Sequence, residues 1–279
     1  MSATIATLLA TARAQLAPVS PSAALDARIL LAEALGVSDS YLFTWSDRSV
    51  DAAGQARFHA WLARRVAGEP VAYILGAREF YGRRFAVSPA TLIPRPDTEL
   101  LVELTLQQAG SAALRVLDLG TGTGAVAITL ALERPQWQLV AVDRVPEALA
   151  LAAANGTELG ARVDWRCSDW FAAVPECFDV IVSNPPYIRA DDPHLVQGDV
   201  RFEPASALVA GDDGLDDVRR IVAEAGVHLR AGGLLLLEHG YDQGAAVRSC
   251  LRQAGFDAVT TARDYGDQER VTWGRWTQC

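Results

Sequence analysis

Hydrophobic positions recur at the spacing of a helix face throughout residues 1–76. One such series consists of Leu25, Ile29, Ala32 and Leu35. A second amphipathic stretch runs from Ala52 to Val66, and its arginines are expected to be solvated charges: Arg57, Arg64 and Arg65. We therefore predict a small helical domain over residues 1–76, in which nothing indicates catalytic chemistry.

Between Glu79 and Pro96 the composition changes to aromatic and β-branched residues with glycine and prolines. It predicts a short hairpin over Phe80–Val87 and then extended backbone, because a proline restricts the residue before it to extended conformations. We expect residues 77–96 to form a hairpin and linker. Asp97 or Thr98 then caps a predicted helix that continues to about Gln108.

After this helix, apolar strands alternate with amphipathic helices, which predicts a parallel sheet covered on both faces. The strands are expected at Arg115–Leu119, Gln138–Val142, Val163–Cys167, Phe178–Ser183 and Gly233–Glu238. Two further strands, Ala258–Ala262 and Arg270–Gly274, leave no room for a helix between them. They must form an antiparallel hairpin, or one of them must insert elsewhere in the sheet. We thus predict an α/β, Rossmann-like domain over residues 97–279.

The charge balance restricts the classes of function. The 279 residues carry a net charge of −9, and the sequence pI is near 5.0. Every basic side chain is an arginine, which excludes a P-loop lysine, a Schiff-base lysine and a lysine general base. The acidic balance also argues against a duplex nucleic-acid binder, which neutralises phosphates with a basic face.

Neither a metal site nor a membrane segment is indicated by the sequence. The four cysteines form no CxxC pair and the four histidines are scattered, so no zinc template fits. No apolar run is long enough to span a bilayer, and the N-terminus lacks a basic region followed by an apolar core and a cleavage site. We therefore expect a cytoplasmic protein.

The strongest motif is VLDLGTGTGAVAI, residues Val116–Ile128. A strand ends at Gly120, and Gly122 and Gly124 allow a tight turn before the helix. Asp143 lies at the tip of the next strand, about 20 residues on, where a carboxylate can accept hydrogen bonds from both ribose hydroxyls of a nucleoside cofactor. The alternative is a tight turn that binds no ligand.

Asp118 distinguishes between classes of nucleoside cofactor. Dinucleotide enzymes place a pyrophosphate at the helix N-terminus, whereas a carboxylate just before the glycines repels phosphate and suits a cation. S-adenosylmethionine, with its sulfonium and ammonium groups, is such a ligand. Asp169 and Trp170, after the third strand, are further cofactor candidates, one as acceptor for the adenine amino group and the other as a stacking surface. Alternatively, either residue lies on the rim of the cofactor site without contacting the cofactor.

A second motif, Asn184-Pro185-Pro186-Tyr187, directly follows the strand FDVIVS, at the edge where parallel sheets bind ligands. The prolines have no N–H, so this stretch offers carbonyl acceptors without competing donors, and Asn184 adds a side-chain oxygen. Tyr187 offers an aromatic face for a flat group. Such a loop can hold a planar NH2 group. The alternative is a proline-stiffened turn with a packing tyrosine.

In combination, these features resemble the release factor glutamine methyltransferase family, known as PrmC or HemK. The resemblance rests on the Asn-Pro-Pro-Tyr loop with the glycine loop, on the linker LIPRPDTE (residues 92–99) and on GDVRFEPASALVAGDDGL (residues 198–215). It covers nearly the whole chain, including the helical part and the terminal RDYGDQERVTWGR (residues 263–275).

The resemblance implies a class I S-adenosylmethionine-dependent methyltransferase domain with a mostly parallel sheet and an antiparallel C-terminal strand. It implies cofactor contacts from Gly120, Thr121, Gly122, Thr123, Gly124, Asp143, Trp170 and Asn184. Residues 184–187 would hold the glutamine of a Gly-Gly-Gln tripeptide in a class-1 peptide chain release factor, which would be methylated at N5 in support of translation termination. The helical domain would help to dock that partner. We expect a monomer that contacts neither nucleic acid nor a membrane.

We predict a direct in-line methyl transfer by positioning and electrostatic preorganisation, because neither motif contains His, Cys or Lys. Two other functions explain part of the pattern. A methyltransferase for adenine or guanine amino groups in DNA or RNA would hold the planar NH2 of a flipped base in the same loop. A catalytically idle module would bind the cofactor and a protein partner only.

Overall fold

The computed structural model of the protein describes residues 3–278. The chain divides into two compact units. The first comprises the chain up to Ala77 together with Pro193–Phe202, and the second comprises Arg78–Asp192 and the chain from Glu203 onward. The predicted domain limits at residues 76 and 96 stay a prediction. Residues 193–202 belong to the helical unit although no pattern in the sequence predicts it.

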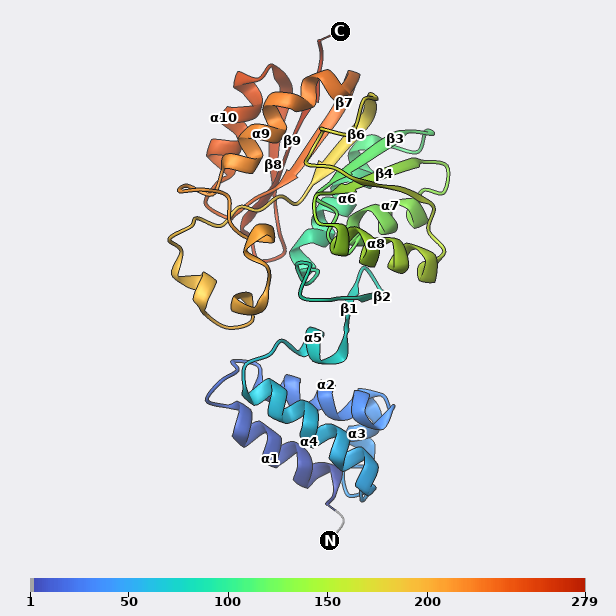
Figure 1. Ribbon diagram of the computed structural model, residues 1–279, viewed down its shortest axis with the longest axis vertical. Coiled ribbons are helices and arrows are strands. Elements are labelled where there is room, and N and C mark those ends of the chain that lie inside the picture. The colour runs from blue at the N-terminus through green and yellow to red at the C-terminus, as the bar shows by residue number, and fades with distance from the viewer. Residues whose placement is uncertain (1–2, 279) are drawn as a thin grey trace. The chain divides into compact units, whose positions relative to one another are not determined.

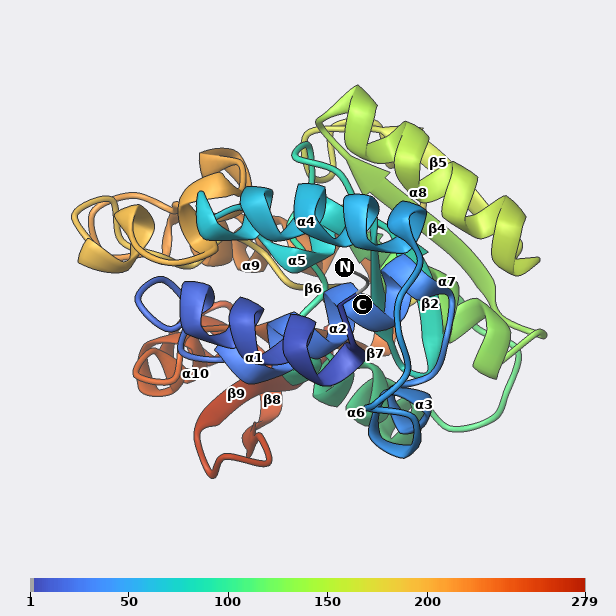
Figure 2. The same ribbon diagram turned by 90° about the horizontal axis from the view of Figure 1, so that it is seen from below.

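The first unit is helical. Its helices are α1 (Ile5–Leu16), α2 (Ala23–Leu35), α3 (Asp39–Thr44), α4 (Ala52–Val66) and α5 (Val71–Leu75), with the 3-10 turns η2 (Pro193–Val196) and η3 (Val200–Phe202). Helices α1, α2 and α4 pack side by side around an apolar core (Figure 2). The side chains of Thr4, Ser38 and Asp51 cap α1, α3 and α4 by accepting hydrogen bonds from first-turn amides.

One polar cluster overturns two expectations for this unit. Arg65 is buried and not solvated, with Nε 2.7 Å from Asp26 Oδ2 and Nη1 2.7 Å from Asp199 Oδ1. Asp26 is therefore buried in α2 while Leu25 is exposed. The buried apolar face of α2 consists of Ala27, Leu30, Leu31 and Ala34, and not of the expected series. The two charges of a buried ion pair neutralise each other. Charged residues can therefore lie in the core although the hydrophobic pattern of the sequence predicts that they are exposed.

Strands β1 (Ala77–Phe80) and β2 (Arg83–Ala86) form a hairpin where the second unit begins. A hairpin was predicted here, but over Phe80–Val87, so the observed one begins earlier in the chain. The main sheet of the second unit has seven strands in the order β5-β4-β3-β6-β7-β9-β8. These strands are β3 (Arg115–Leu119), β4 (Gln138–Asp143), β5 (Val163–Cys167), β6 (Phe178–Ser183), β7 (Leu229–Glu238), β8 (Phe256–Arg263) and β9 (Glu269–Trp276). Its helices are α6 (Glu99–Ala109), α7 (Ala125–Glu133), α8 (Pro146–Leu159), α9 (Asp216–Ala225) and α10 (Gly244–Gln253), with the 3-10 turns η1 (Pro96–Thr98), η4 (Ala205–Ala207) and η5 (Gly226–His228).

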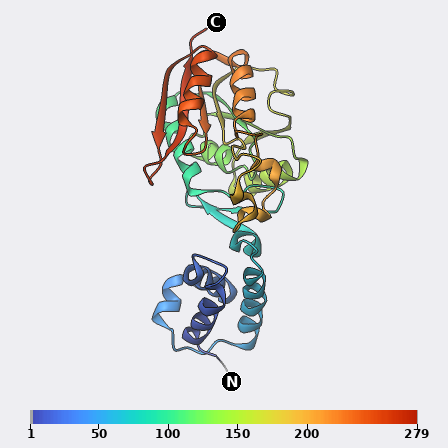
Figure 3. The same ribbon diagram turned by 90° about the vertical axis from the view of Figure 1, so that its left-hand side faces the viewer.

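Strands β3 to β7 are mutually parallel, which confirms the predicted fold class. The last two strands satisfy both alternatives left open by the sequence. They pair as an antiparallel hairpin, and β9 inserts between β7 and β8. The hairpin forms one edge of the sheet (Figure 3).

Side chains alternate between two cores on opposite faces of the sheet, as the pleat of a strand requires. Val180 and Val182 pack in the core that contains α6 and α7, whereas Ile181 packs in the core that contains α9 and α10. Figure 1 shows these helices on the sheet. Within the described residues, no helix is long and apolar enough to cross a membrane.

The register places the two sequence motifs together. Leu119, the last residue of β3, pairs with Ser183, the last residue of β6. Ser183 pairs in turn with Leu237 of β7. The glycine loop and the Asn-Pro-Pro-Tyr loop therefore leave the sheet side by side at its carboxyl edge, where Glu238 ends β7.

Candidate functional site

A cavity opens at this carboxyl edge. Sequence-predicted residues that line it are Asp118, Gly120, Thr121, Gly122, Thr123, Asp143, Asp169, Trp170, Asn184 and Pro186. Gly124, Pro185 and Tyr187, which were also predicted, are not among the lining residues. The structure thus brings the two motifs and the segment after β5 to one cavity.

The glycines of the loop serve different purposes. Gly120, Gly122 and Gly124 all have left-handed backbone, with φ of +70°, +55° and +81°. A Cβ on Gly124 would lie 2.9 Å from Ile128 Cδ1, so this glycine allows the loop to pack against helices. A Cβ on Gly122 would meet nothing within 4 Å, because this residue faces open space. A Cβ on Gly120 would lie 3.2 Å from the ring of Trp170.

Asp143 ends β4 and is buried at the cavity wall. Its Oδ2 accepts a hydrogen bond from the Gly122 amide and its Oδ1 accepts one from the Val145 amide, each at 2.9 Å. Each carboxylate oxygen keeps a second lone pair. The carboxylate is therefore fixed in place by the loop and can still accept hydrogen bonds from a pair of ligand hydroxyls.

Asp118 lies deeper, with its Oδ2 accepting a 2.6 Å hydrogen bond from the Thr121 hydroxyl. Burial raises the pKa of Asp118 to about 7, against the lowering effect of its hydrogen bonds. Asp143 adds a repulsion that raises this pKa further. The ionised form of Asp118 is thus costly in the free protein, and a cation in the cavity would offset that cost.

Trp170 and Asp169 occupy different environments. Trp170 is buried in the core beneath α9 and α10 and has a left-handed backbone, with φ +50°. The hydroxyl of Ser168 donates to its carbonyl at 2.9 Å. Asp169 is half exposed and pairs with Arg220 at 2.9 Å. The Trp170 side chain is therefore packed in the core where it borders the cavity, and the Asp169 carboxylate already has a partner.

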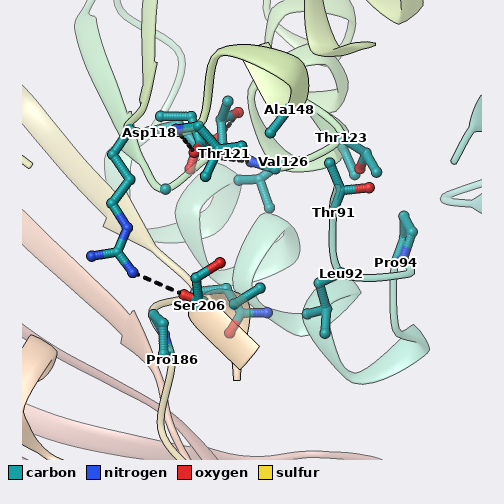
Figure 4. Close-up of a pocket in the computed structure, with 18 of the residues that line it drawn as sticks. Thr91, Leu92, Pro94, Asp118, Thr121, Thr123, Val126, Ala148, Pro186 and Ser206 are labelled. Atoms are coloured by element: carbon teal, nitrogen blue, oxygen red, sulfur yellow. Dashed lines mark hydrogen bonds between the residues drawn. The ribbon is translucent and has the colours of Figure 1, made fainter. Parts of the chain in front are cut away.

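The wall of the cavity that lies across from Asp118 was not predicted from the sequence. It includes Thr91, Leu92 and Pro94 from the linker together with Ser206. In Figure 4, Asp118, Thr121 and Val126 lie on one side of the cavity, and Leu92, Ser206 and Pro186 lie on the other.

This wall is held by one buried carboxylate, that of Glu203. The carboxylate accepts a hydrogen bond from the Ile93 amide at 3.2 Å and forms an ion pair with Arg95. The signal for this wall was present in the segments LIPRPDTE and VRFEP, which contain both partners.

The Asn-Pro-Pro-Tyr loop is anchored from behind. Asn184 Nδ2 donates to Thr98 Oγ1 at 3.0 Å, and the Tyr187 hydroxyl is 3.5 Å from Glu238 Oε1. Burial, and secondarily the charge of Glu238, raises the pKa of Tyr187. The carbonyl of Tyr187 accepts from Gln243 Nε2 at 3.0 Å. Thr98 occupies the expected cap position of α6, but its side chain makes no cap hydrogen bond there.

The cavity suits a nucleoside with a cationic group. Two carboxylates, Asp118 and Asp143, face a space that is bounded by glycines and apolar residues. Among the described residues that line it there is no histidine or cysteine. Across residues 3–278, no group of three or more His, Cys, Asp or Glu side chains is arranged to hold a metal ion.

Comparisons with known proteins identify relatives of this chain. The family model for the PrmC N-terminal domain matches residues 7–76, and the methyltransferase small domain matches residues 96–201. The release factor glutamine methyltransferase of Pseudomonas aeruginosa is 57% identical over 93% of this chain and 95% of its own. The Escherichia coli enzyme of the same name is 49% identical over 91% and 92%, respectively.

Among solved structures, the fold is similar to that of the T. thermophilus 16S rRNA N2 G1207 methyltransferase RsmC, which was solved in complex with AdoMet and guanosine. The TM-score is 0.52 at 20% identity, with 72% of this chain and 50% of that chain covered. At this identity the similarity concerns the fold.

Proposed function

The chain belongs to the release factor glutamine methyltransferase family, and from this premise we propose that it methylates a release factor. The methyl group passes from S-adenosylmethionine to the N5 side-chain amide nitrogen of the glutamine in the Gly-Gly-Gln tripeptide of class-1 factors. The modification supports translation termination. The observation that carries the proposal is the Asn184–Tyr187 loop, which leaves the sheet beside the glycine loop at the cavity.

The residues of the cavity fit S-adenosylmethionine. When bound, this cofactor supplies an electrophilic methyl group on a positively charged sulfur. We assign Asp143 to the ribose hydroxyls, because it lines the cavity and each of its oxygens keeps a lone pair that no described hydrogen bond uses. The glycine loop, residues 120–124, would cover the nucleoside, with Trp170 and Asp169 toward the adenine. Asp118 would compensate the positive charge.

The Asn-Pro-Pro-Tyr loop would hold the amide to be methylated. Asn184 Oδ1 and the Pro185 carbonyl accept the two hydrogens of the NH2 group, and neither proline offers a competing N–H. An amide nitrogen is a poor nucleophile, so this pair of acceptors acts by fixing its plane and its line of attack. Once the nitrogen has bonded to carbon it is strongly acidic, and its proton leaves to one of these acceptors or to water. Tyr187 would pack against the flat amide.

We further propose that the enzyme works as a monomer in the cytoplasm, without nucleic acid, and that the helical first unit helps to dock the release factor. The acidic net charge of −9 supports a protein partner over a nucleic acid. The relatives' activity on a release factor supports the same choice of partner.

Transfer of a tritiated methyl group tests the proposal. The substrates are a purified class-1 release factor, the same factor with the tripeptide glutamine changed to alanine, and total cellular RNA and DNA. We expect label on the unaltered factor alone. Label on nucleic acid alone would mean that the loop holds a base, and label on the alanine variant would place the methylated atom elsewhere in the factor.

A further inference from the structure

Gln243, directly before α10, bonds the Asn-Pro-Pro-Tyr loop through its side chain. Its Nε2 donates to the Tyr187 carbonyl at 3.0 Å and to the Gly214 carbonyl at 3.2 Å, while its Oε1 accepts from the Gly240 amide at 2.9 Å. We propose that Gln243 is a positioning residue, which fixes the Tyr187 end of the loop and thereby holds the Pro185 carbonyl of the clamp in place. Gly214 makes room for this contact. The inference rests on the clamp role proposed above for the loop.

The backbone around Gln243 accommodates its amide in one orientation. Three backbone carbonyls lie around Nε2, with that of Asp213 the most distant at 3.4 Å, whereas a backbone N–H faces Oε1. A carbonyl only accepts, so the two hydrogens of the amide nitrogen must point to the carbonyls and the amide oxygen to the N–H. Gln243 is 9% exposed, so water does not readily replace these bonds. The site therefore requires a side chain that donates at one atom and accepts at the other.

The loop is held at both ends and is stiff between them. At its first residue, Asn184 Nδ2 donates to Thr98 Oγ1 at 3.0 Å, and at its last residue the Tyr187 carbonyl accepts from Gln243. The two prolines between these residues have a fixed φ. The Pro185 carbonyl therefore has little freedom to rotate while both ends are bonded. Release of the Tyr187 carbonyl would allow that end of the loop to move, and the acceptor would lose its alignment with the substrate NH2.

Gly214 permits the close approach of the loop and Gln243. Its backbone is left-handed, with φ +74°. A Cβ at this position would lie 2.3 Å from the Tyr187 carbonyl oxygen and 2.7 Å from Gln243 Nε2. An alanine would therefore displace the loop or break its bond to Gln243. The sequence run GDDGL, residues 211–215, thus has a physical reason for its second glycine.

The peptide group that bonds Gln243 Oε1 is itself held from behind. The Gly240 carbonyl lies 2.8 Å from His239 Nδ1, and because a carbonyl only accepts, this nitrogen carries the proton. His239 Nε2 then accepts from the Thr272 hydroxyl of β9 at 2.8 Å. His239 is fully buried, and burial lowers its pKa, in agreement with a neutral ring. These hydrogen bonds connect Gln243 to the main sheet, so the loop is anchored to a rigid element.

The test uses Gln243→Met, Gln243→Glu and Gly214→Ala in the full-length enzyme, with methylation of a class-1 release factor as readout. Gln253→Met is the control for loss of an amide, since Gln253 ends α10 and its Nε2 bonds Ser249 Oγ of the same helix at 3.2 Å. Gly232→Ala is the control for backbone strain, since Gly232 is also left-handed, with φ +81°, and its Cβ would meet nothing within 4 Å. Cofactor affinity and thermal stability are measured in parallel, so that a folding defect is recognised.

We expect Gln243→Met and Gly214→Ala to lower kcat by about 10- to 100-fold, the loss typical of a misplaced reacting group, with little change in cofactor affinity or in the KM for the release factor. Gln243→Glu should be slower still, because an ionised carboxylate has no hydrogen to donate and would face carbonyl oxygens. Both control variants should turn over like the wild type.

Three results would overturn the inference. They are a kcat of Gln243→Met equal to that of Gln253→Met, a kcat of Gly214→Ala equal to that of Gly232→Ala, and a wild-type kcat for Gln243→Glu. If the Gln243 variants do not fold, Gly214→Ala decides the question, because it keeps the glutamine and disturbs the same carbonyl. A wild-type enzyme that does not methylate the factor would instead refute the proposed function itself.

Discussion

Asn155 of α8 connects the hairpin and the glycine loop by three hydrogen bonds. Its Oδ1 accepts from the Ala86 amide at 2.8 Å, and its Nδ2 donates to the carbonyls of Ala86 at 3.0 Å and Thr123 at 2.9 Å. The side chain is 4% exposed. Asn155→Leu keeps the approximate size and removes all three bonds, so it isolates their contribution from that of volume.

The magnitude follows from where the three partners lie. Ala86 is exposed, so water can replace its two bonds at a loss of about 0.5–1 kcal/mol each. Thr123 is buried, and its carbonyl would be left without a partner at a cost of about 1–3 kcal/mol. The sum is about 3 kcal/mol, which lowers Tm by about 6–12 °C for a unit of this size. Asn155→Asp should cost at least as much, because a carboxylate cannot donate to either carbonyl.

The assay is thermal unfolding followed by tryptophan fluorescence, with Gln136→Leu as control. Gln136 is an exposed amide that also bonds a backbone carbonyl, that of Ser111 at 3.0 Å, so its loss should change stability by less than about 0.5 kcal/mol. Because Thr123 lines the cavity, cofactor affinity should fall together with Tm in the Asn155 variants. If Asn155→Leu unfolds at the same temperature as Gln136→Leu, the hydrogen bonds do not hold the loop and the reasoning fails.

Three further predictions concern the cofactor cavity. Asp143→Asn should weaken S-adenosylmethionine binding by about 10- to 100-fold in calorimetry, since charge-assisted hydrogen bonds contribute about 1.5–3 kcal/mol each. Unchanged affinity would mean that Asp143 does not bind the cofactor. Gly124→Ala should lower the free energy of unfolding in urea by about 2–4 kcal/mol, because the new Cβ would clash with its neighbours and the backbone is left-handed. Gly122→Ala should lower it by only about 1 kcal/mol, because its Cβ would meet nothing. Equal losses for the two variants would contradict the close packing around Gly124. Burial raises the pKa of Asp118 to about 7, above an unfolded value of about 3.9, so its contribution to stability is present below about pH 4 and is lost as the pH rises through about 7. The unfolding free energy of Asp118→Asn should therefore vary less between pH 4 and 7 than that of the wild type, and parallel curves would contradict the burial of this carboxylate.

Local patterns predicted most of the second unit. Strands β3, β5 and β6 have the bounds expected from the sequence. Strand β7 begins at Leu229 instead of Gly233, since an irregularity in its pairing with β6 extends it past two glycines.

The missed features depend on contacts between residues far apart in the chain. The local pattern predicts a solvated charge at Arg65, because its buried partner Asp26 lies 39 residues away in the chain. Glu203 and the linker it holds are 108–110 residues apart. The sequence predicts that Asp97 or Thr98 caps α6, whereas in the fold the Thr98 hydroxyl oxygen accepts a hydrogen bond from Asn184. A sequence shows which side chains are capable of such bonds, whereas the tertiary structure selects the partner.

In the proposed mechanism, Asn184 clamps the amide nitrogen that receives the methyl group. The most direct test is single-turnover methyl transfer to the release factor by Asn184→Ala, with cofactor affinity measured on the same preparation. We predict that cofactor binding persists while the transfer rate falls by about 100-fold or more, as expected when a preorganised polar group is removed from a transition state. An Asn184→Ala enzyme that binds the cofactor and transfers methyl at the wild-type rate would contradict the account.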